Sequence, residues 1–236
     1  MTMKIFIGYE PHETVAFHTL VQSIMEHANE PVEIHPLSLK QLRGIHQRKR
    51  DPRQSNDFTY IRFLVPYLCG YAGQALFMDC DMIFREDPRN LFSHFDGKYA
   101  VHVVKHDYEP RDDIKYLGTR QYSYPRKNWS SVVLWNCEHP SNRCIKPHLV
   151  DTASPSMLHR FEWLKDSEIG ELPVKWNWLV GEYDEPPEDV GIVHWTVGGP
   201  YFDEYTDADF ADEWEALLKQ VLHCTQNSDL QKDVAG

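Results

Sequence analysis

The segment ALFMDCDMIF (residues 75–84) places two aspartates, Asp79 and Asp81, at the end of an apolar run typical of a buried strand. Side chains two positions apart in an extended segment point to the same side, so the two carboxylates are expected to lie close together. Two like charges at the edge of an apolar core require a neutralising partner. Paired carboxylates at this spacing suit an octahedral, oxygen-preferring cation. The segment therefore predicts a strand whose carboxyl end carries a metal site.

The Asp-x-Asp pattern is weak evidence by itself, because the chain contains a second copy in Asp207 and Asp209. The second copy opens an acidic, amphipathic segment at residues 207–223 that predicts a helix with an aspartate cap. Carboxylates at a helix start are favoured by the helix dipole, which explains this copy without a ligand. The apolar context of Asp79 and Asp81 is what distinguishes the first copy.

Predicted strands and helices alternate on both sides of residues 75–84. Short β-branched and apolar runs predict strands at residues 4–8, 32–37, 74–80, 99–104, 130–136 and 191–195. Apolar spacing predicts helices at residues 12–27, 58–68 and 207–223, and prolines bracket a further candidate at 155–164. The alternation predicts an α/β fold with a mostly parallel central sheet, helices on both faces and ligands at the carboxyl ends of the strands. Residues 105–128 show no clear period, as is typical of a functional or mobile segment.

A late histidine, His194, ends the predicted strand at residues 191–195. It is followed by Gly198 and Gly199, where the backbone could approach a ligand closely. An isolated histidine at such a place is more often a structural residue than a ligand. As a third ligand beside two carboxylates, it would favour Mn²⁺ over Mg²⁺, because imidazole suits the hardest cations poorly.

A second group of potential metal ligands lies further along the chain. Its members are Cys137, His139, Cys144 and His148. Their spacing differs from that of the usual structural zinc sites, so a surface loop with incidental cysteines and histidines is the favoured interpretation. A metal site there is kept as the minor alternative.

Length, charge and cysteine content limit the possible domain organisation and ligands. The chain has 236 residues, of which 42% are hydrophobic, and we predict one domain at residues 1–223 followed by a flexible tail at 224–236. A net charge of −12 argues against binding to nucleic acid or an anionic membrane. The basic run at residues 47–53 fits a solvated loop better than a phosphate site. An anionic ligand would therefore need a metal or a few well-placed cations to reverse the local charge.

No segment is long and apolar enough to predict a membrane span, and five cysteines without framework spacing suit a reducing compartment. These observations predict a cytoplasmic protein. The sequence also lacks a P-loop, a dinucleotide-binding glycine pattern, a nucleophile elbow and a zinc-protease helix.

Five short motifs occur in an order that resembles a known family: IFIGYE (5–10), YIRFLVPYL (60–68) before residues 75–84, SSVVLWN (130–136), LPVKWNWL (172–179) and HWTVGGPYF (194–202). Over about residues 4–202 the chain is similar to the retaining GT-A glycosyltransferases of the lipopolysaccharide galactosyltransferase and glycogenin group, particularly small bacterial members. The resemblance implies metal-dependent transfer of a sugar from a nucleotide diphosphate sugar, with UDP-sugar as the expected donor. The implied acceptor is a glycan, a lipid-linked group or a small molecule.

The resemblance also implies roles for particular residues. Asp79, Asp81 and His194 would hold Mn²⁺ or Mg²⁺. Arg62 would lie beside the donor, and Cys80 would offer it backbone atoms. The remaining implied donor contacts are the base-binding Gly8 and Tyr9, the strand-start residues Trp129, Ser130 and Ser131, and Gly198 of the glycine turn.

Two departures from the family pattern affect these expectations. The family's lysine in the closing motif is Gly199 here, so a phosphate contact is either missing or supplied from elsewhere, with Arg126 and Lys127 as the candidates. The Asp-Gln-Asp triplet expected before residues 172–177 is absent, and Glu162 is the nearest carboxyl group by position. Without a clear nucleophile, front-face attack guided by the leaving phosphate competes with a covalent intermediate. The departures also motivate an alternative, a catalytically inactive GT-A-like protein that binds nucleotides or glycans; sugar nucleotidyl transfer is disfavoured because no glycine-rich loop follows residues 4–8.

Overall fold

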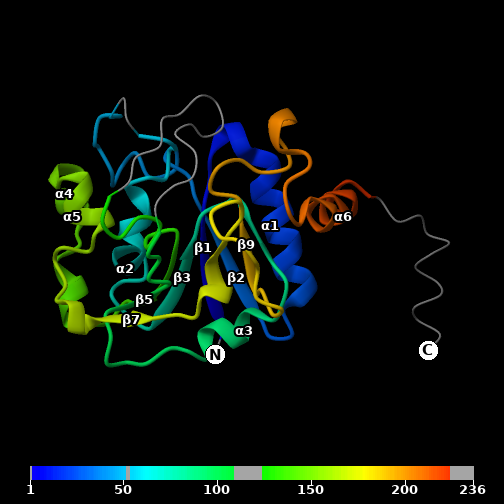
Figure 1. The fold of residues 1–236 in the computed structure, drawn as a ribbon. Coiled ribbons are helices and arrows are strands. Elements are labelled where there is room, and N and C mark those ends of the chain that lie inside the picture. The colour runs from blue at the N-terminus through cyan, green and yellow to red at the C-terminus, as the bar shows by residue number, and fades with distance from the viewer. Residues whose placement is uncertain (1, 52–53, 109–123, 224–236) are drawn as a thin grey trace.

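The computed structural model describes residues 2–51, 54–108 and 124–223 (Figure 1). The tail predicted at residues 224–236 lies outside the described residues, and so do residues 109–123 of the segment without a clear period.

The central sheet has six strands in the order β2-β1-β3-β6-β5-β7. All neighbours pair in parallel except β6, which is antiparallel to both β3 and β5. These strands are β1 (Met3–Gly8), β2 (Val32–Leu37), β3 (Gln74–Met78), β5 (Val101–Val103), β6 (Val132–Asn136) and β7 (Ile169–Glu171). The predicted α/β fold with a mostly parallel central sheet is confirmed.

A second, three-stranded sheet has the order β4-β9-β8. Its strands are β4 (Met82–Phe84), β8 (Trp178–Leu179) and β9 (Ile192–His194). β9 lies between the other two, antiparallel to β4 and parallel to β8, so His194 faces Met82 on one side and Leu179 on the other. Only β9 of these three strands was predicted as a separate strand.

The helices of the described residues are short apart from two. The α-helices are α1 (Thr14–His27), α2 (Val65–Leu68), α3 (Pro88–Phe92), α4 (Pro147–Thr152), α5 (Pro155–His159) and α6 (Ala211–Leu222). The 3₁₀ helices are η1 (Pro11–Glu13), η2 (Ile61–Leu64), η4 (Pro140–Cys144), η5 (Asp166–Glu168), η6 (Val174–Asn177) and η7 (Asp203–Tyr205). Within the described residues no helix combines the length and apolar character needed to cross a membrane.

Three helix predictions need correction. The helix expected at 58–68 starts only at residue 61 and divides into the 3₁₀ helix η2 and the short α2, whose second residue, Pro66, has no N–H to continue the helical hydrogen bonds. The helix expected at 155–164 ends at residue 159, because Phe161 is left-handed, with φ of 53°. The aspartate cap predicted for residues 207–223 is wrong: Phe210 occupies the N-cap position of α6 and no side chain caps it.

The strands at the centre of the main sheet are buried on both faces. Consecutive residues of β3 and β6 are almost fully buried, and because successive side chains point to opposite faces, both faces must be covered. Apolar residues of α1, η2 and α2 complete this core. Figure 1 shows β1 running from the N-terminus at the bottom to the upper edge of the sheet, where the carboxyl ends of β1 and the parallel β3 meet. The segments that carry Gly8 and Asp79 therefore leave the sheet at the same edge.

Candidate metal and donor site

Asp79 and Asp81 lie in the short connection between β3 and β4. The backbone N–H of Asp79 donates to the carbonyl of Ser131 (3.0 Å), and the carbonyl of Asp81 accepts from the N–H of Trp195 (3.0 Å). The connection is thus tied to the start of β6 on one side and to the end of β9 on the other. Both carboxylates remain close to the surface, with side chains 13% and 12% exposed.

His194 joins the two aspartates from the second sheet. Its side chain is buried, and Nε2 lies 3.4 Å from Oδ1 of Asp81. One ligand atom each from Asp79, Asp81 and His194 lie within 4.8 Å of one another, and no other such group of potential metal ligands occurs among the described residues. The structure therefore brings together the three residues that the sequence pointed to.

The donor set fits a divalent cation. Two carboxylate oxygens and one imidazole nitrogen match Mn²⁺ better than Mg²⁺. Metal–oxygen bonds of about 2.1 Å hold ligand atoms no more than about 4.2 Å apart, so the three groups need only a small contraction around an ion. Glu10 and Glu13 add two buried carboxyl groups beside this site, and their negative charge acts on Cys80 together with that of the aspartates. A cation at Asp79 and Asp81 would offset this local excess of negative charge.

Arg62 binds directly to the first aspartate. Its guanidinium NH1 lies 2.8 Å from Oδ1 of Asp79 and donates to the carbonyl of Ser130 at 2.8 Å. The group is buried and lies over the rings of Phe58 and Phe77. The arginine predicted to lie beside the donor thus neutralises and orients Asp79.

The other nitrogen of His194 contacts a residue that the sequence interpretation did not single out. Nδ1 of His194 lies 2.8 Å from Oδ1 of Asn177, which is buried at the end of η6. The only sequence signal for Asn177 was its position within the motif LPVKWNWL, and that position did not indicate a contact with His194.

Cys80 lies between the two aspartates with its thiol buried. Burial, followed by the negative charges of Glu13 and Asp81, raises the pKa of this thiol well above its usual value. The side chain therefore stays protonated, which makes it a poor metal ligand or nucleophile. A donor contact from this residue would have to come from its backbone, as the resemblance implies.

The two glycines expected at the donor site make close ring contacts. A Cβ on Gly8 would lie 2.4 Å from the ring of Phe58, and one on Gly198 would lie 2.3 Å from the ring of Tyr205. Side chains cannot be accommodated at that distance, so packing alone explains both glycines. Tyr9 is half-buried with its ring edge-on to Phe17.

Gly199 replaces the lysine of the resembling family, and its surroundings explain why. A Cβ at this position would lie 2.2 Å from the ring of Tyr201. The Tyr201 hydroxyl donates to Oε2 of the buried Glu13 at 2.6 Å, which ties the glycine turn to the start of α1. Burial and the charge of Glu13 raise the pKa of Tyr201, so its hydroxyl remains a donor.

The residues before β6 are held by a dense set of hydrogen bonds. Ser130 Oγ lies 2.8 Å from Nδ1 of His159, and burial together with the charge of Arg62 lowers the pKa of that histidine to about 3. Ser131 Oγ donates to the carbonyl of Asn128 at 2.7 Å. The predicted sugar-contacting serines are thus anchored at the same edge as Asp79.

The two cations expected to replace the missing lysine differ in their surroundings. Arg126 donates to the carbonyl of Arg160 and pairs with Asp166. Lys127 is buried, with Nζ 5.8 Å from the ring centre of Tyr108. Both residues stay predictions for the phosphate contact.

Glu162, the candidate catalytic carboxyl group, is 47% exposed in the turn after α5 and lies 4.0 Å from Arg160. Its role stays a prediction. The buried carboxyl groups near the site, Glu10 and Glu13, were not identified from the sequence, because nothing in their local pattern distinguishes them from surface acids.

The alternative metal site does not form. His139 Nδ1 accepts from the N–H of Ser141 and caps η4, the Cys144 thiol donates to the carbonyl of Ser141, and Cys137 is fully buried. Among the described residues, these side chains are not part of any group that could hold a metal.

Several solved structures share this fold. The glycosyltransferase GlyE of Streptococcus pneumoniae superposes with a TM-score of 0.63 and 14% identity over 99% of this chain and 64% of that protein. The galactosyltransferase LgtC, crystallised with donor and acceptor sugar analogues, gives a TM-score of 0.60 and 11% identity over 95% of this chain and 98% of that protein. The bifunctional glycosyltransferase WbbM gives a TM-score of 0.59 and 14% identity over 92% of this chain, and the match spans 49% of that protein. The chain has the GT-A fold of these glycosyltransferases.

At the level of sequence, the chain is 43% identical over 217 residues to Protein CDI of Arabidopsis thaliana, covering 89% of this chain and 84% of that protein. It belongs to the family of Protein CDI. No model of a protein family matches the chain.

Proposed function

We propose that this protein is a metal-dependent glycosyltransferase that moves a sugar from a nucleotide diphosphate sugar, a UDP-sugar, to an acceptor with retention of configuration. The observation that carries the proposal is the grouping of Asp79, Asp81 and His194 at the carboxyl edge of a GT-A sheet. Ligands of open α/β sheets bind at this edge. GlyE, LgtC and WbbM, which share the fold, are glycosyltransferases by name.

Charge gives the physical reason for a metal in this mechanism. A protein with a net charge of −12 repels a diphosphate unless the charge is reversed locally. A divalent ion held by Asp79, Asp81 and His194 would act as a Lewis acid on the two phosphates and offset the charge on the departing nucleoside diphosphate. Arg62 pairs with Asp79 and orients its carboxylate, and Lys127 adds a second cation near the start of β6.

The attack on the sugar is proposed to occur from the front face, guided by the leaving phosphate. Glu162 is the candidate for a covalent intermediate, but an exposed carboxylate next to Arg160 gains no activation from its surroundings. The acceptor is a glycan, a lipid-linked group or a small molecule. We further propose that residues 1–223 form one domain and that the protein works in the cytoplasm.

The proposal is tested first by thermal shift with UDP, GDP and CDP, each with Mn²⁺ or with a chelator. UDP is expected to stabilise the protein only with Mn²⁺, and purified enzyme is expected to release UDP from a UDP-sugar. NMR of the product then gives its anomeric configuration. Nucleotide binding that is equally tight in the chelator would rule out the metal-bridged model.

An inactive nucleotide- or glycan-binding protein is the alternative. It is favoured by one observation, that Gly199 stands where the family has a lysine and the ring of Tyr201 leaves no room for a Cβ there. Tight, metal-dependent binding without UDP release, across a broad panel of acceptors, would select this alternative.

A further inference from the structure

The hydrogen bonds around Asn177 fit only one assignment of donors and acceptors, and this assignment extends to the imidazole of His194. The starting point is Ser131, whose Oγ lies 2.7 Å from the carbonyl of Asn128. A carbonyl can only accept, so the single hydroxyl proton of Ser131 is used there. Ser131 Oγ must therefore accept from Asn177, which lies 2.8 Å away.

This direction fixes the orientation of the Asn177 side-chain amide. Its amino group faces three acceptors: Ser131 Oγ at 2.8 Å, His106 Nε2 at 2.9 Å and the Asn128 carbonyl at 3.5 Å. A flipped amide would place its oxygen against a carbonyl oxygen and against a hydroxyl with no proton left to donate. The oxygen of Asn177 must consequently face His194.

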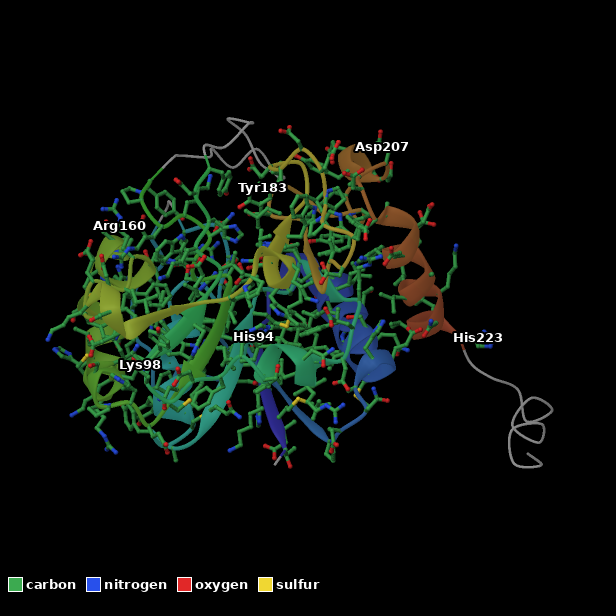
Figure 2. The ribbon with its side chains drawn as sticks, turned by 60° about the horizontal axis from the view of Figure 1, so that its bottom comes forward. His94, Lys98, Arg160, Tyr183, Asp207 and His223 are labelled. Carbon is green, nitrogen blue, oxygen red and sulfur yellow. The ribbon has the colours of Figure 1, made fainter. Side chains whose placement is uncertain are left out.

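His106 supports the same orientation from the other side. Its Nδ1 lies 2.7 Å from the hydroxyl of Tyr183, so the ring can donate there and accept from Asn177 at Nε2. Burial lowers the pKa of His106 to about 3, so the ring stays neutral and keeps one accepting nitrogen, which is Nε2 when Nδ1–H donates to Tyr183. Tyr183, which ends this chain of contacts, lies toward the upper side of the molecule in Figure 2, away from His94 and Lys98.

We propose that Asn177 is a positioning residue that holds His194 as the Nδ1–H tautomer and thereby presents an unprotonated Nε2 to the metal. Oδ1 of Asn177 lies 2.8 Å from Nδ1 of His194, so Nδ1 must carry the proton, while Nε2 points toward Asp81 at 3.4 Å. A histidine that ligates a metal commonly donates its other N–H to an oxygen, which fixes the ring and its tautomer. The proposal rests on the proposed metal site, but it concerns residues whose arrangement exists without the ion.

Two measurements test the role of Asn177 without using activity. The first is the ¹⁵N NMR spectrum of the imidazoles in metal-free protein, with His194 assigned from the His194→Gln variant. The second is the affinity for Mn²⁺ alone, followed by electron paramagnetic resonance in the absence of nucleotide.

The informative variants are Asn177→Leu and Asn177→Asp. In Asn177→Leu, His194 should lose its single tautomer, and Mn²⁺ affinity should fall roughly 10- to 100-fold, as for other outer partners of metal ligands. Asn177→Asp should recover most of the affinity, because a carboxylate oxygen still accepts from Nδ1–H. The matched control is Asn142→Leu, since Asn142 is equally buried and donates to two carbonyls, those of Ala100 and Asn136. It should lose stability and keep both the tautomer and the affinity.

The proposal is overturned if wild-type His194 carries its proton on Nε2, or if folded Asn177→Leu binds Mn²⁺ as tightly as the wild type. Should Asn177→Leu fail to fold, the wild-type tautomer and Asn177→Asp still decide the matter. A wild-type protein that binds no Mn²⁺ would instead refute the proposed function, and the tautomer would then show whether Asn177 orients His194.

Discussion

At the scale of single residues, the two Asp-x-Asp copies provide a variant and its control. Asp81→Asn removes a charged oxygen from the cluster with Asp79 and His194, whereas Asp207 is exposed in the turn before α6. Mn²⁺ affinity in Asp81→Asn should fall by more than the roughly 10- to 100-fold expected for an outer partner. Asp207→Asn should bind like the wild type. Isothermal titration with Mn²⁺ measures both, and equal loss in the two variants would mean that overall charge, not the site, controls binding.

Arg62 permits a second prediction at this scale. Arg62→Met removes the guanidinium that pairs with the largely buried Asp79 carboxylate and donates to the Ser130 carbonyl. Removing one partner of a buried ion pair typically lowers the free energy of unfolding by about 3–5 kcal/mol. The control is Arg89→Met, because Arg89 and Glu30 form an exposed pair at 3.5 Å, for which a change within about 1 kcal/mol is expected.

Both arginine variants are compared by urea unfolding in the presence of a chelator. Mn²⁺ should restore part of the stability lost in Arg62→Met, because the ion supplies Asp79 with another positive charge. A loss in Arg62→Met no larger than that in Arg89→Met would show that the ion pair contributes little to the fold.

The role of a single residue can be predicted when the residues next to it in the sequence indicate that role. Asp79 and Asp81 could be selected because they follow an apolar strand, and His194 because it ends one. Asn177 could not, since its function arises from contacts with His106, Ser131 and His194, at separations of 71, 46 and 17 residues. Only the fold brings these polar groups together, and no periodic pattern in the sequence indicates their contacts.

At the scale of elements, all the longer strands were predicted, whereas of the three-residue strands β5 and β9 were predicted and β4 and β7 were not. β1, β2, β3 and β6 have five or six residues each and could be predicted from their apolar runs. β4 and β8, with three and two residues, are too short to show alternation and exist only because each pairs with β9. The end of α5 at residue 159 and the start of α6 at residue 211 depend on the left-handed residues Phe161 and Phe210, a conformation that the residue type phenylalanine does not favour.

The start of α3 gives a prediction for an element. Asp87 caps this helix, accepting from the N–H of Arg89 at 2.8 Å, and its other oxygen accepts from the side chain of Asn29 at 3.0 Å. Partial burial raises the pKa of Asp87, but these hydrogen bonds outweigh it, so the pKa lies below the ordinary 3.8. The resulting stability is present above pH 3.8 and is lost as the pH falls through the native pKa.

Asp87→Ala should therefore lower the free energy of unfolding by about 1 kcal/mol at neutral pH, and the difference should shrink in acid below the ordinary carboxyl pKa. Asp87→Asn keeps a capping oxygen without the charge, so it should lose less at neutral pH. Urea unfolding over a pH series measures both variants. A difference between wild type and Asp87→Ala that is the same at every pH would contradict the role given to the charge.

At the scale of the whole molecule, the candidate metal site joins two layers of the fold. Asp79 and Asp81 follow β3 of the six-stranded sheet, whereas His194 belongs to β9 of the three-stranded sheet. The three-stranded sheet contributes to both apolar clusters: Met82, Phe84 and Ile192 belong to the main cluster around β1 and β3, whereas Ile83 and Val193 pack with α6 in the second. α6 also packs against α1, as Figure 1 shows at the right of the molecule. An ion bound by all three residues would add a connection between the two sheets to the one that packing already provides.

Thermal unfolding tests this linkage and the prediction of a single domain together. Binding to the native state alone stabilises by about 2.7 kcal/mol at a free Mn²⁺ concentration 100 times the dissociation constant. For a chain of this size that corresponds to a rise in Tm of roughly 5–11 °C. Calorimetry should show one transition that moves upward as a whole with Mn²⁺, returns to its starting value in a chelator, and stays fixed in Asp81→Asn. Two transitions, of which only one responds to the ion, would mean that the two sheets unfold separately and that the chain is not a single cooperative domain.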